Sequence, residues 1–129
     1  MRNRPLFIVT AVAEIGAGLG LMVSPSLVAS ILIGAPFDTA ADAVVGRVAG
    51  SALLALGLIC WLARNDGQNS ATSGIMLGML LYNAVVVVVL AYAGIGWRLS
   101  GIGLWPTVVL HTAMSVWCFT WLTRASTHT

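Results

Sequence analysis

Charge is what this chain lacks most. Only 8% of its 129 residues are charged, lysine is absent, and all six basic residues are arginine. Soluble domains carry about 25% charged residues, and a chain this poor in charge would expose large apolar patches to water. The formal net charge of +2, with no cluster of arginines, gives no basis for nucleic-acid binding. The composition therefore predicts a protein whose surroundings are membrane lipid.

Catalytic and metal-binding motifs are missing as well. The two cysteines, Cys60 and Cys118, form no C-x-x-C motif. We expect them to face different ways and to form no disulfide. The chain has no phosphate-binding loop, no nucleophile elbow and no H-E-x-x-H motif. We therefore predict no catalytic residue and no metal site; the sequence favours a protein that is not an enzyme and leaves an enzyme without a recognisable motif open.

Long apolar runs take the place of these motifs. Each run is close to the roughly 20 residues that a helix needs to cross about 30 Å of hydrocarbon. Strands of a membrane β-barrel would alternate in polarity, but residues 85–90 read Val-Val-Val-Val-Val-Leu. The sequence predicts one all-α transmembrane domain over residues 1–129, folded as a four-transmembrane-helix bundle. The predicted spans are 6–23, 44–63, 74–93 and 104–122.

The first outer loop carries an apolar segment that is too short to cross a membrane. Residues 26–33 end at Gly34, and we expect them to form a short helix in the interface. Asp38 or Thr39 is then expected to cap the second span. Asp42 falls in the first turn of that span, where a negative charge suits the helix dipole.

The arginines predict the orientation of the bundle. With four spans, most of them fall on one side, which the positive-inside rule makes cytoplasmic. These are Arg2, Arg4, Arg64 and Arg124, whereas Asp38, Asp42 and Arg98 fall on the opposite side. We therefore expect a multi-pass protein of a bacterial inner membrane with both termini in the cytoplasm. The first run also resembles a secretory signal, but Glu14 interrupts it and no small-x-small cleavage site follows, so we expect the first helix to be retained.

Each predicted span contains one strongly polar residue: Glu14, Arg47, Asn83 and His111. An ionisable group inside a bilayer costs roughly 2.5–3.5 kcal/mol on insertion scales. Glu14, Asn83 and His111 lie at comparable depths, whereas Arg47 begins nearer the outer side and has a long side chain that can extend along its helix. We therefore expect these residues to meet in one buried polar cluster. The leading contact hypothesis is an ion pair between Glu14 and Arg47.

Small residues accompany the charged positions and allow helix backbones to approach closely. The candidate helix-packing residues are Gly16, Gly18, Gly20, Gly46, Gly50, Ser51, Gly74 and Gly78. His111 has two interpretations, a hydrogen-bonded packing residue or a haem ligand contributed by each copy of a dimer. His128, near the end of the chain, is a poor second ligand.

A family resemblance rests on two short motifs. Arg47-Val48-Ala49-Gly50 early in the second span and Ala55-Leu56-Gly57 after it resemble DoxX-like small bacterial membrane proteins. That resemblance implies a four-helix membrane architecture and supplies no catalytic residues. Glu14 is similar to the embedded glutamate of small multidrug resistance transporters, which binds proton and cation alternately. Arg47 and the long first outer loop depart from that second pattern.

Three functions follow as expectations. The first is a non-catalytic accessory subunit or self-associating scaffold, present as a homo-oligomer or within a membrane complex, with no cofactor. The second is a small proton-coupled transporter that uses Glu14. The third is a quinone- or haem-linked redox partner that uses His111.

Overall fold

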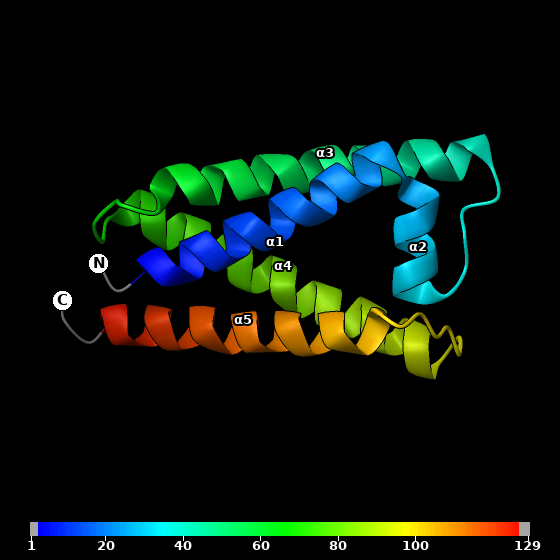
Figure 1. Cartoon of the computed structure of the whole chain (residues 1–129). Helices are drawn as coiled ribbons and strands as arrows, with labels where there is room; N and C mark the ends of the chain where they lie inside the picture. Colours follow the sequence, from blue (N-terminus) through cyan, green and yellow to red (C-terminus); the bar gives the residue numbers. More distant parts are fainter. Residues whose placement is uncertain (1–2, 127–129) are drawn as a thin grey trace.

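The computed structural model describes residues 3–126, which form five helices and no strand (Figure 1). The helices are α1 (Arg4–Val23), α2 (Pro25–Ile33), α3 (Ala40–Ala63), α4 (Ser70–Ile95) and α5 (Leu104–Ser126). The predicted all-helical fold is confirmed, and a short helix follows the first long one, as expected. Arg2 and His128, which entered the predictions of orientation and of haem ligation, lie outside the described residues.

Two capping boxes set the starts of α3 and α4. Thr39 accepts from the backbone N–H of Asp42, and Asp42 Oδ2 accepts from the backbone N–H of Thr39, each at 3.1 Å. Asn69 and Thr72 make the same reciprocal pair at the start of α4. Each box satisfies backbone donors that the first helical turn leaves free. Both helices therefore begin four residues before the apolar runs from which spans 44–63 and 74–93 were predicted.

The long helices associate as two pairs, α1 with α3 and α4 with α5 (Figure 1). Contacts between the pairs are few and involve mainly α1 and α5. In Figure 1 the pairs lie close together at the end where α1 begins and α5 finishes, and they diverge toward the other end. The short helix α2 crosses the wide end between them.

Close backbone contacts fasten the far end of α2 to the loop before α5. The backbone N–H of Gly103 donates to the carbonyl of Ile31 at 2.8 Å. A Cβ on Gly101 would overlap the backbone of Ile31 and Leu32. Gly34 ends α2 in the left-handed region, at φ 75°, where glycine has no steric penalty. The helix α2 thus connects the α1–α3 pair to the α4–α5 pair.

The apolar core lies in the narrow half of the bundle. Leu6, Phe7 and Met76 are fully buried there. Cys60, Met79, Met114 and Cys118 belong to the same cluster. Asn3 donates to the carbonyl of Asp66 at 3.2 Å and ties the start of α1 to the loop between α3 and α4. The main cluster of buried apolar side chains therefore lies toward one end of the molecule.

Among the described helices, α1, α3 and α4 are long and apolar enough to cross a membrane. The chain thus has the character of a membrane protein. The helix α5, which carries the predicted fourth span, is not among those three. It contains His111 and a series of hydroxyl side chains, which lower its apolar content: Thr107, Thr112, Ser115, Thr120 and Thr123.

Candidate functional site

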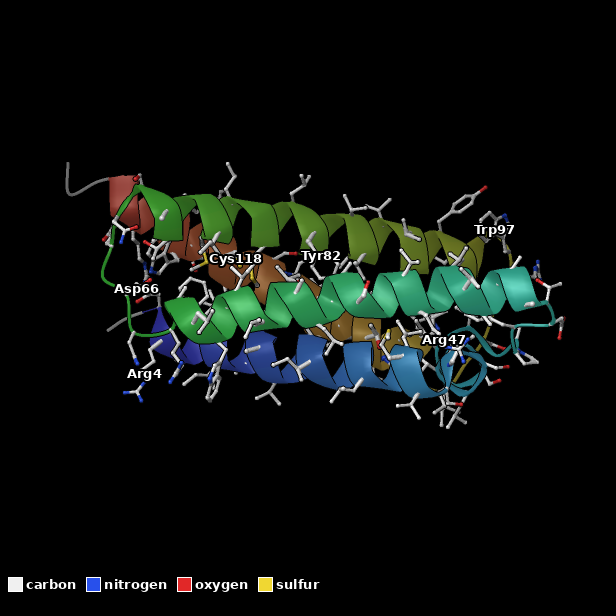
Figure 2. All side chains as sticks on the ribbon, turned by 90° about the horizontal axis from the view of Figure 1, so that it is seen from above. Arg4, Arg47, Asp66, Tyr82, Trp97 and Cys118 are labelled. Carbon is white, nitrogen blue, oxygen red and sulfur yellow. The ribbon has the colours of Figure 1, made fainter. Side chains whose placement is uncertain are left out.

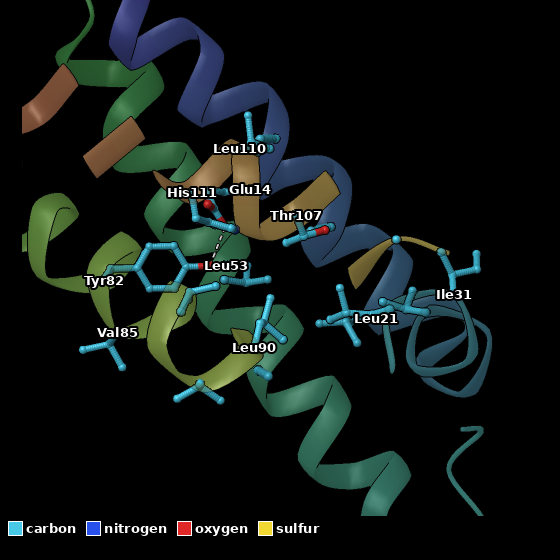
Figure 3. Close-up of a pocket in the computed structure, with 18 residues that line it drawn as sticks. Glu14, Leu21, Ile31, Leu53, Tyr82, Val85, Leu90, Thr107, Leu110 and His111 are labelled. Carbon is cyan, nitrogen blue, oxygen red and sulfur yellow. Dashed lines mark hydrogen bonds between the residues drawn. The ribbon is translucent and has the colours of Figure 1, made fainter. Parts of the chain in front are cut away.

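Glu14 lies midway along α1, and its side chain is 4% exposed. Its carboxylate accepts a hydrogen bond from the hydroxyl of Tyr82 on α4, with 3.0 Å between Oη and Oε2 (Figure 3). Tyr82 is half-buried, and the carboxylate gives its hydroxyl a strong acceptor. The contact joins residues 68 positions apart in the chain and links the two helix pairs.

A second hydrogen-bonded pair joins α4 to α5. His111 Nδ1 lies 2.7 Å from Asn83 Oδ1, and Asn83 Nδ2 donates to the carbonyl of Met79 at 2.7 Å. Because the amide nitrogen of Asn83 is used as a donor, its oxygen must be the acceptor. His111 Nδ1 therefore carries the proton in this contact.

The ring of Tyr82 connects these two pairs. It meets the ring of His111 edge to face, with 5.7 Å between the centroids. Such T-shaped contacts are a favoured arrangement of aromatic rings. We call the resulting set the polar cluster: Glu14, Tyr82, Asn83 and His111. Three helices, α1, α4 and α5, contribute to it.

Arg47, the fourth residue of the predicted cluster, lies elsewhere. Its side chain is exposed, and its Nε donates to the carbonyl of Met22 at 3.2 Å. Gly18 and Gly50 lie opposite each other where α1 meets α3, which places Arg47 level with Met22. Glu14 is eight residues from Met22, or about 12 Å along the helix axis. The predicted Glu14–Arg47 ion pair is therefore absent, because the register of the two helices separates the charges. Figure 2 shows Arg47 toward one end of the bundle and Tyr82, the hydrogen-bond partner of Glu14, nearer its middle.

The predicted packing glycines divide into three groups. Gly18 and Gly50 lie at the crossing of α1 and α3, where a Cβ on either would come within 2.8 Å of the other's carbonyl oxygen. Gly20 and Gly46 face Val28, Pro25 and Phe37 in the α2 region rather than another long helix. The third group makes no close helix contact within this chain, since Ser51 is exposed and a Cβ on the glycines would meet nothing within 4 Å: Gly16, Gly74, Gly78 and Ser51.

Two contributors were missed by the sequence interpretation. Gly57 packs against α1, and a Cβ there would lie 2.7 Å from Ile15 Cγ1. Tyr82 was passed over because an aromatic residue in an apolar helix is ordinarily a packing residue. Its hydroxyl was the available signal, since a buried Tyr in a lipid-facing helix requires a hydrogen-bond partner.

A cavity of about 570 Å³ lies beside the polar cluster (Figure 3). Its polar lining comes from Glu14, Tyr82, Thr107 and His111. The remaining walls are apolar and come from all five helices and from Gly103 in the loop before α5, with Leu53 on α3 and Val86 on α4 as examples. The narrow half of the bundle is filled by the core, so the cavity occupies the half where the helix pairs diverge.

The cysteines contact the core and not the cavity. Both are buried free thiols, and Cys60 Sγ lies 3.1 Å from Met79 Sδ. Both belong to one core cluster. The expectation that they face different ways assumed that the Arg47 face of α3 points inward, and that assumption is wrong because Arg47 is exposed. Within residues 3–126, no group of three or more His, Cys, Asp or Glu side chains could hold a metal ion.

Comparisons with known proteins found no protein-family model, curated protein or solved structure that matches this chain. The resemblances to DoxX-like proteins and to small multidrug resistance transporters therefore stay predictions. The site is interpreted from its own geometry.

Proposed function

We propose that this chain is a multi-pass membrane protein that binds a lipophilic small molecule between its two helix pairs. The observation that carries the proposal is the cavity of about 570 Å³ with apolar walls and a few polar side chains. Binding sites for small molecules have volumes of about 300–1,000 Å³ and the same combination of apolar walls with a few orienting polar groups. Glu14, Tyr82 and His111 supply those groups.

We further propose four membrane spans, with α5 as the fourth. Its 23 residues give a length of about 35 Å, enough to cross the hydrocarbon region. The ends of the helices that carry Arg4, Arg64 and Arg124 lie at one end of the bundle, whereas Arg98 lies in the loop at the other. The arginine-rich end then faces the cytoplasm of a bacterial inner membrane, together with both chain termini.

Transport and electron transfer would both start from this binding step. A proton-coupled transporter would use Glu14 in the cavity, and a quinone- or haem-linked redox partner would use His111. Arg47 lies away from Glu14 and does not pair with its carboxylate. This separation favours the transporter over a scaffold that would be held together by a Glu14–Arg47 ion pair. Ligand binding is the function common to both, and it is the one that we propose.

Filling the cavity tests this proposal. Ala17 on α1 and Ala55 on α3 are both exposed, but Ala17 lines the cavity and Ala55 does not. In nanodiscs, Ala17→Phe is expected to weaken the binding of Nile red, a neutral lipophilic dye, by about tenfold. Ala55→Phe, which adds the same ring on the outer surface, is expected to change the affinity less than about twofold. Equal affinities for two folded variants would contradict the proposal.

One observation favours self-association as a second function. Gly74 and Gly78 are one helical turn apart on α4, and a Cβ on either would meet nothing within 4 Å. Leu77 and Leu81 on the same helix are 60% and 66% exposed. A small-residue pair of this kind allows two membrane helices to approach closely. Replacing both glycines with leucine should then abolish a dimer seen by sedimentation in detergent, whereas Ala55→Leu should not. A dimer that survives the double replacement would exclude this interface.

A further inference from the structure

Two acceptor atoms of the polar cluster are left without partners beside the cavity. Glu14 and His111 both line it, and both contact Tyr82. Oε2 of Glu14 accepts a hydrogen bond from Tyr82, and Nδ1 of His111 is hydrogen-bonded to Asn83. Within residues 3–126, Oε1 of Glu14 and Nε2 of His111 make no hydrogen bond. Neither atom is fully buried, and both residues line the cavity.

The tautomer of His111 decides what the second of these atoms can do. His111 donates through Nδ1, because the oxygen of Asn83 is the acceptor in that contact. In a neutral imidazole the other nitrogen, Nε2, then carries a lone pair and accepts hydrogen bonds. The cavity therefore presents a carboxylate oxygen and an imidazole nitrogen, both acceptors, to whatever occupies it.

The carboxylate also lacks a positive partner. Arg47 lies about 12 Å along the bundle from Glu14 and bonds to the carbonyl of Met22. The other arginines in the described part of the chain lie at or beyond the helix ends: Arg4, Arg64, Arg98 and Arg124. A carboxylate among apolar side chains is stabilised strongly by a cation that also donates hydrogen bonds.

We propose that the bound molecule is a lipophilic primary amine, an inference that rests on the ligand-binding function proposed above. Its ammonium group pairs with Glu14, and a second N–H donates to Nε2 of His111. An ammonium has three donors and no acceptor, which matches the two unpartnered acceptor atoms of Glu14 and His111. The hydrocarbon part lies along the apolar wall formed by Leu21, Val28 and Leu32. Tyr82 holds the carboxylate in place through its hydroxyl.

The same geometry disfavours two related ligands. A fatty alcohol of equal length has one donor and no charge, so it forms one hydrogen bond to the carboxylate but leaves the negative charge of Glu14 unpaired. An ammonium adds the attraction between opposite charges and a further hydrogen bond, to His111. A fatty acid would place a second carboxylate against Glu14, and like charges in an apolar site repel strongly. The expected order of affinity is amine, alcohol, acid.

Displacement of Nile red from the protein in nanodiscs tests the inference with n-decylamine and n-decanol. Wild-type protein is expected to prefer the amine by about tenfold, after correction for the uptake of each probe by protein-free nanodiscs. Glu14→Gln should reduce the amine-to-alcohol ratio to about one. Asp38→Asn removes the same charge at an exposed site outside the cavity and should leave the ratio unchanged.

The ratio isolates the role of the carboxylate, because uptake by the lipid is the same for every variant and cancels. Equal ratios for wild type and Glu14→Gln would overturn the amine assignment. That result, with Nile red binding still sensitive to Ala17→Phe, would leave the ligand-binding function standing. Nile red binding that is insensitive to Ala17→Phe would instead overturn the proposed function. If Glu14→Gln does not fold, the corrected wild-type ratio decides, and a value near one overturns the assignment.

Discussion

At the scale of single residues, mutual hydrogen bonding lets polar side chains remain inside this apolar bundle. Asn83 is 1% exposed and uses both halves of its amide, the nitrogen toward Met79 and the oxygen toward His111. Burying a polar group costs free energy unless its hydrogen bonds are satisfied. Each member of the pair is therefore stabilised by the presence of the other.

This dependence predicts the effect of replacing Asn83. Asn83→Leu leaves Nδ1–H of His111 buried without an acceptor, so the free energy of unfolding should fall by about 1–3 kcal/mol. Combining it with His111→Leu removes the stranded donor and should recover part of the loss. Thr112→Val is the control, because the exposed Thr112 hydroxyl bonds within its own helix, and it should change stability by less than about 0.5 kcal/mol.

The measurement is a double-mutant cycle followed by equilibrium unfolding in mixed micelles. A coupling between Asn83 and His111 that differs from zero is expected. Strictly additive losses would contradict the idea that the two side chains satisfy each other.

Individual polar residues were more predictable than their partners. Glu14, Asn83 and His111 stand out in apolar runs because of their polarity alone, and all three are buried in the structure. Arg47 stands out equally, but its position depends on how α1 is registered against α3. Tyr82 does not stand out, although it is the residue that contacts both Glu14 and His111. Residue type thus identified Glu14, Asn83 and His111 as buried polar residues, and packing geometry decided which side chains contact one another.

At the scale of elements, the crossing of α1 and α3 controls the register that separates Glu14 from Arg47. Gly18 and Gly50 allow the two backbones to approach, and Gly57 packs against Ile15 further along. In lipid, close packing of small residues is a principal source of helix association. Loss of this contact should therefore weaken the whole α1–α3 pair.

Two neighbouring glycines on α1 make a matched test of this contact. A Cβ at Gly18 would lie 2.8 Å from the carbonyl oxygen of Gly50, whereas one at Gly16 would meet nothing within 4 Å. Gly18→Ala should lower the free energy of unfolding by about 1–3 kcal/mol, as overpacking does. Gly16→Ala should leave it unchanged or raise it by up to about 1 kcal/mol through helix propensity. The comparison uses equilibrium unfolding in mixed micelles, and equal effects of the two changes would contradict the crossing.

The elements themselves were largely readable from local chemistry. Asp38 or Thr39 was expected to cap the second long helix, and Thr39 does so, in a complete capping box with Asp42. The apolar runs understated the lengths of α3 and α4, because polar first turns such as residues 70–73 carry no hydropathy signal. Glycine spacing was less informative, since Gly74 and Gly78 have the same four-residue spacing as Gly46 and Gly50, but a Cβ on either would meet nothing within 4 Å. Spacing gives a helix face, and only the partner helix decides whether that face is used.

At the scale of the whole molecule, packing is divided between a filled half and a hollow half. The core around Phe7 and Met76 fills the narrow end, and the cavity lies where α2 holds the helix pairs apart. Hydropathy could predict the number of apolar runs but not this division, because it arises from the angle between the pairs. The polar cluster lies midway along α1 and α4, beside the cavity. That position is what connects the fold to the proposed ligand.

The same arrangement predicts the topology in a membrane, with α5 as the decisive helix because its hydropathy is the weakest of the four long ones. Single cysteines are introduced by Asp38→Cys, Asp66→Cys, Arg98→Cys and Thr123→Cys, in a background where Cys60 and Cys118 are replaced by serine. If all four long helices cross, a membrane-impermeant maleimide added to spheroplasts should label positions 38 and 98, and positions 66 and 123 only after permeabilisation. Labelling of position 123 from outside, with position 66 still protected, would mean that α5 does not cross the membrane. The bundle would then have three spans, and the α5 wall of the cavity would lie against the membrane surface.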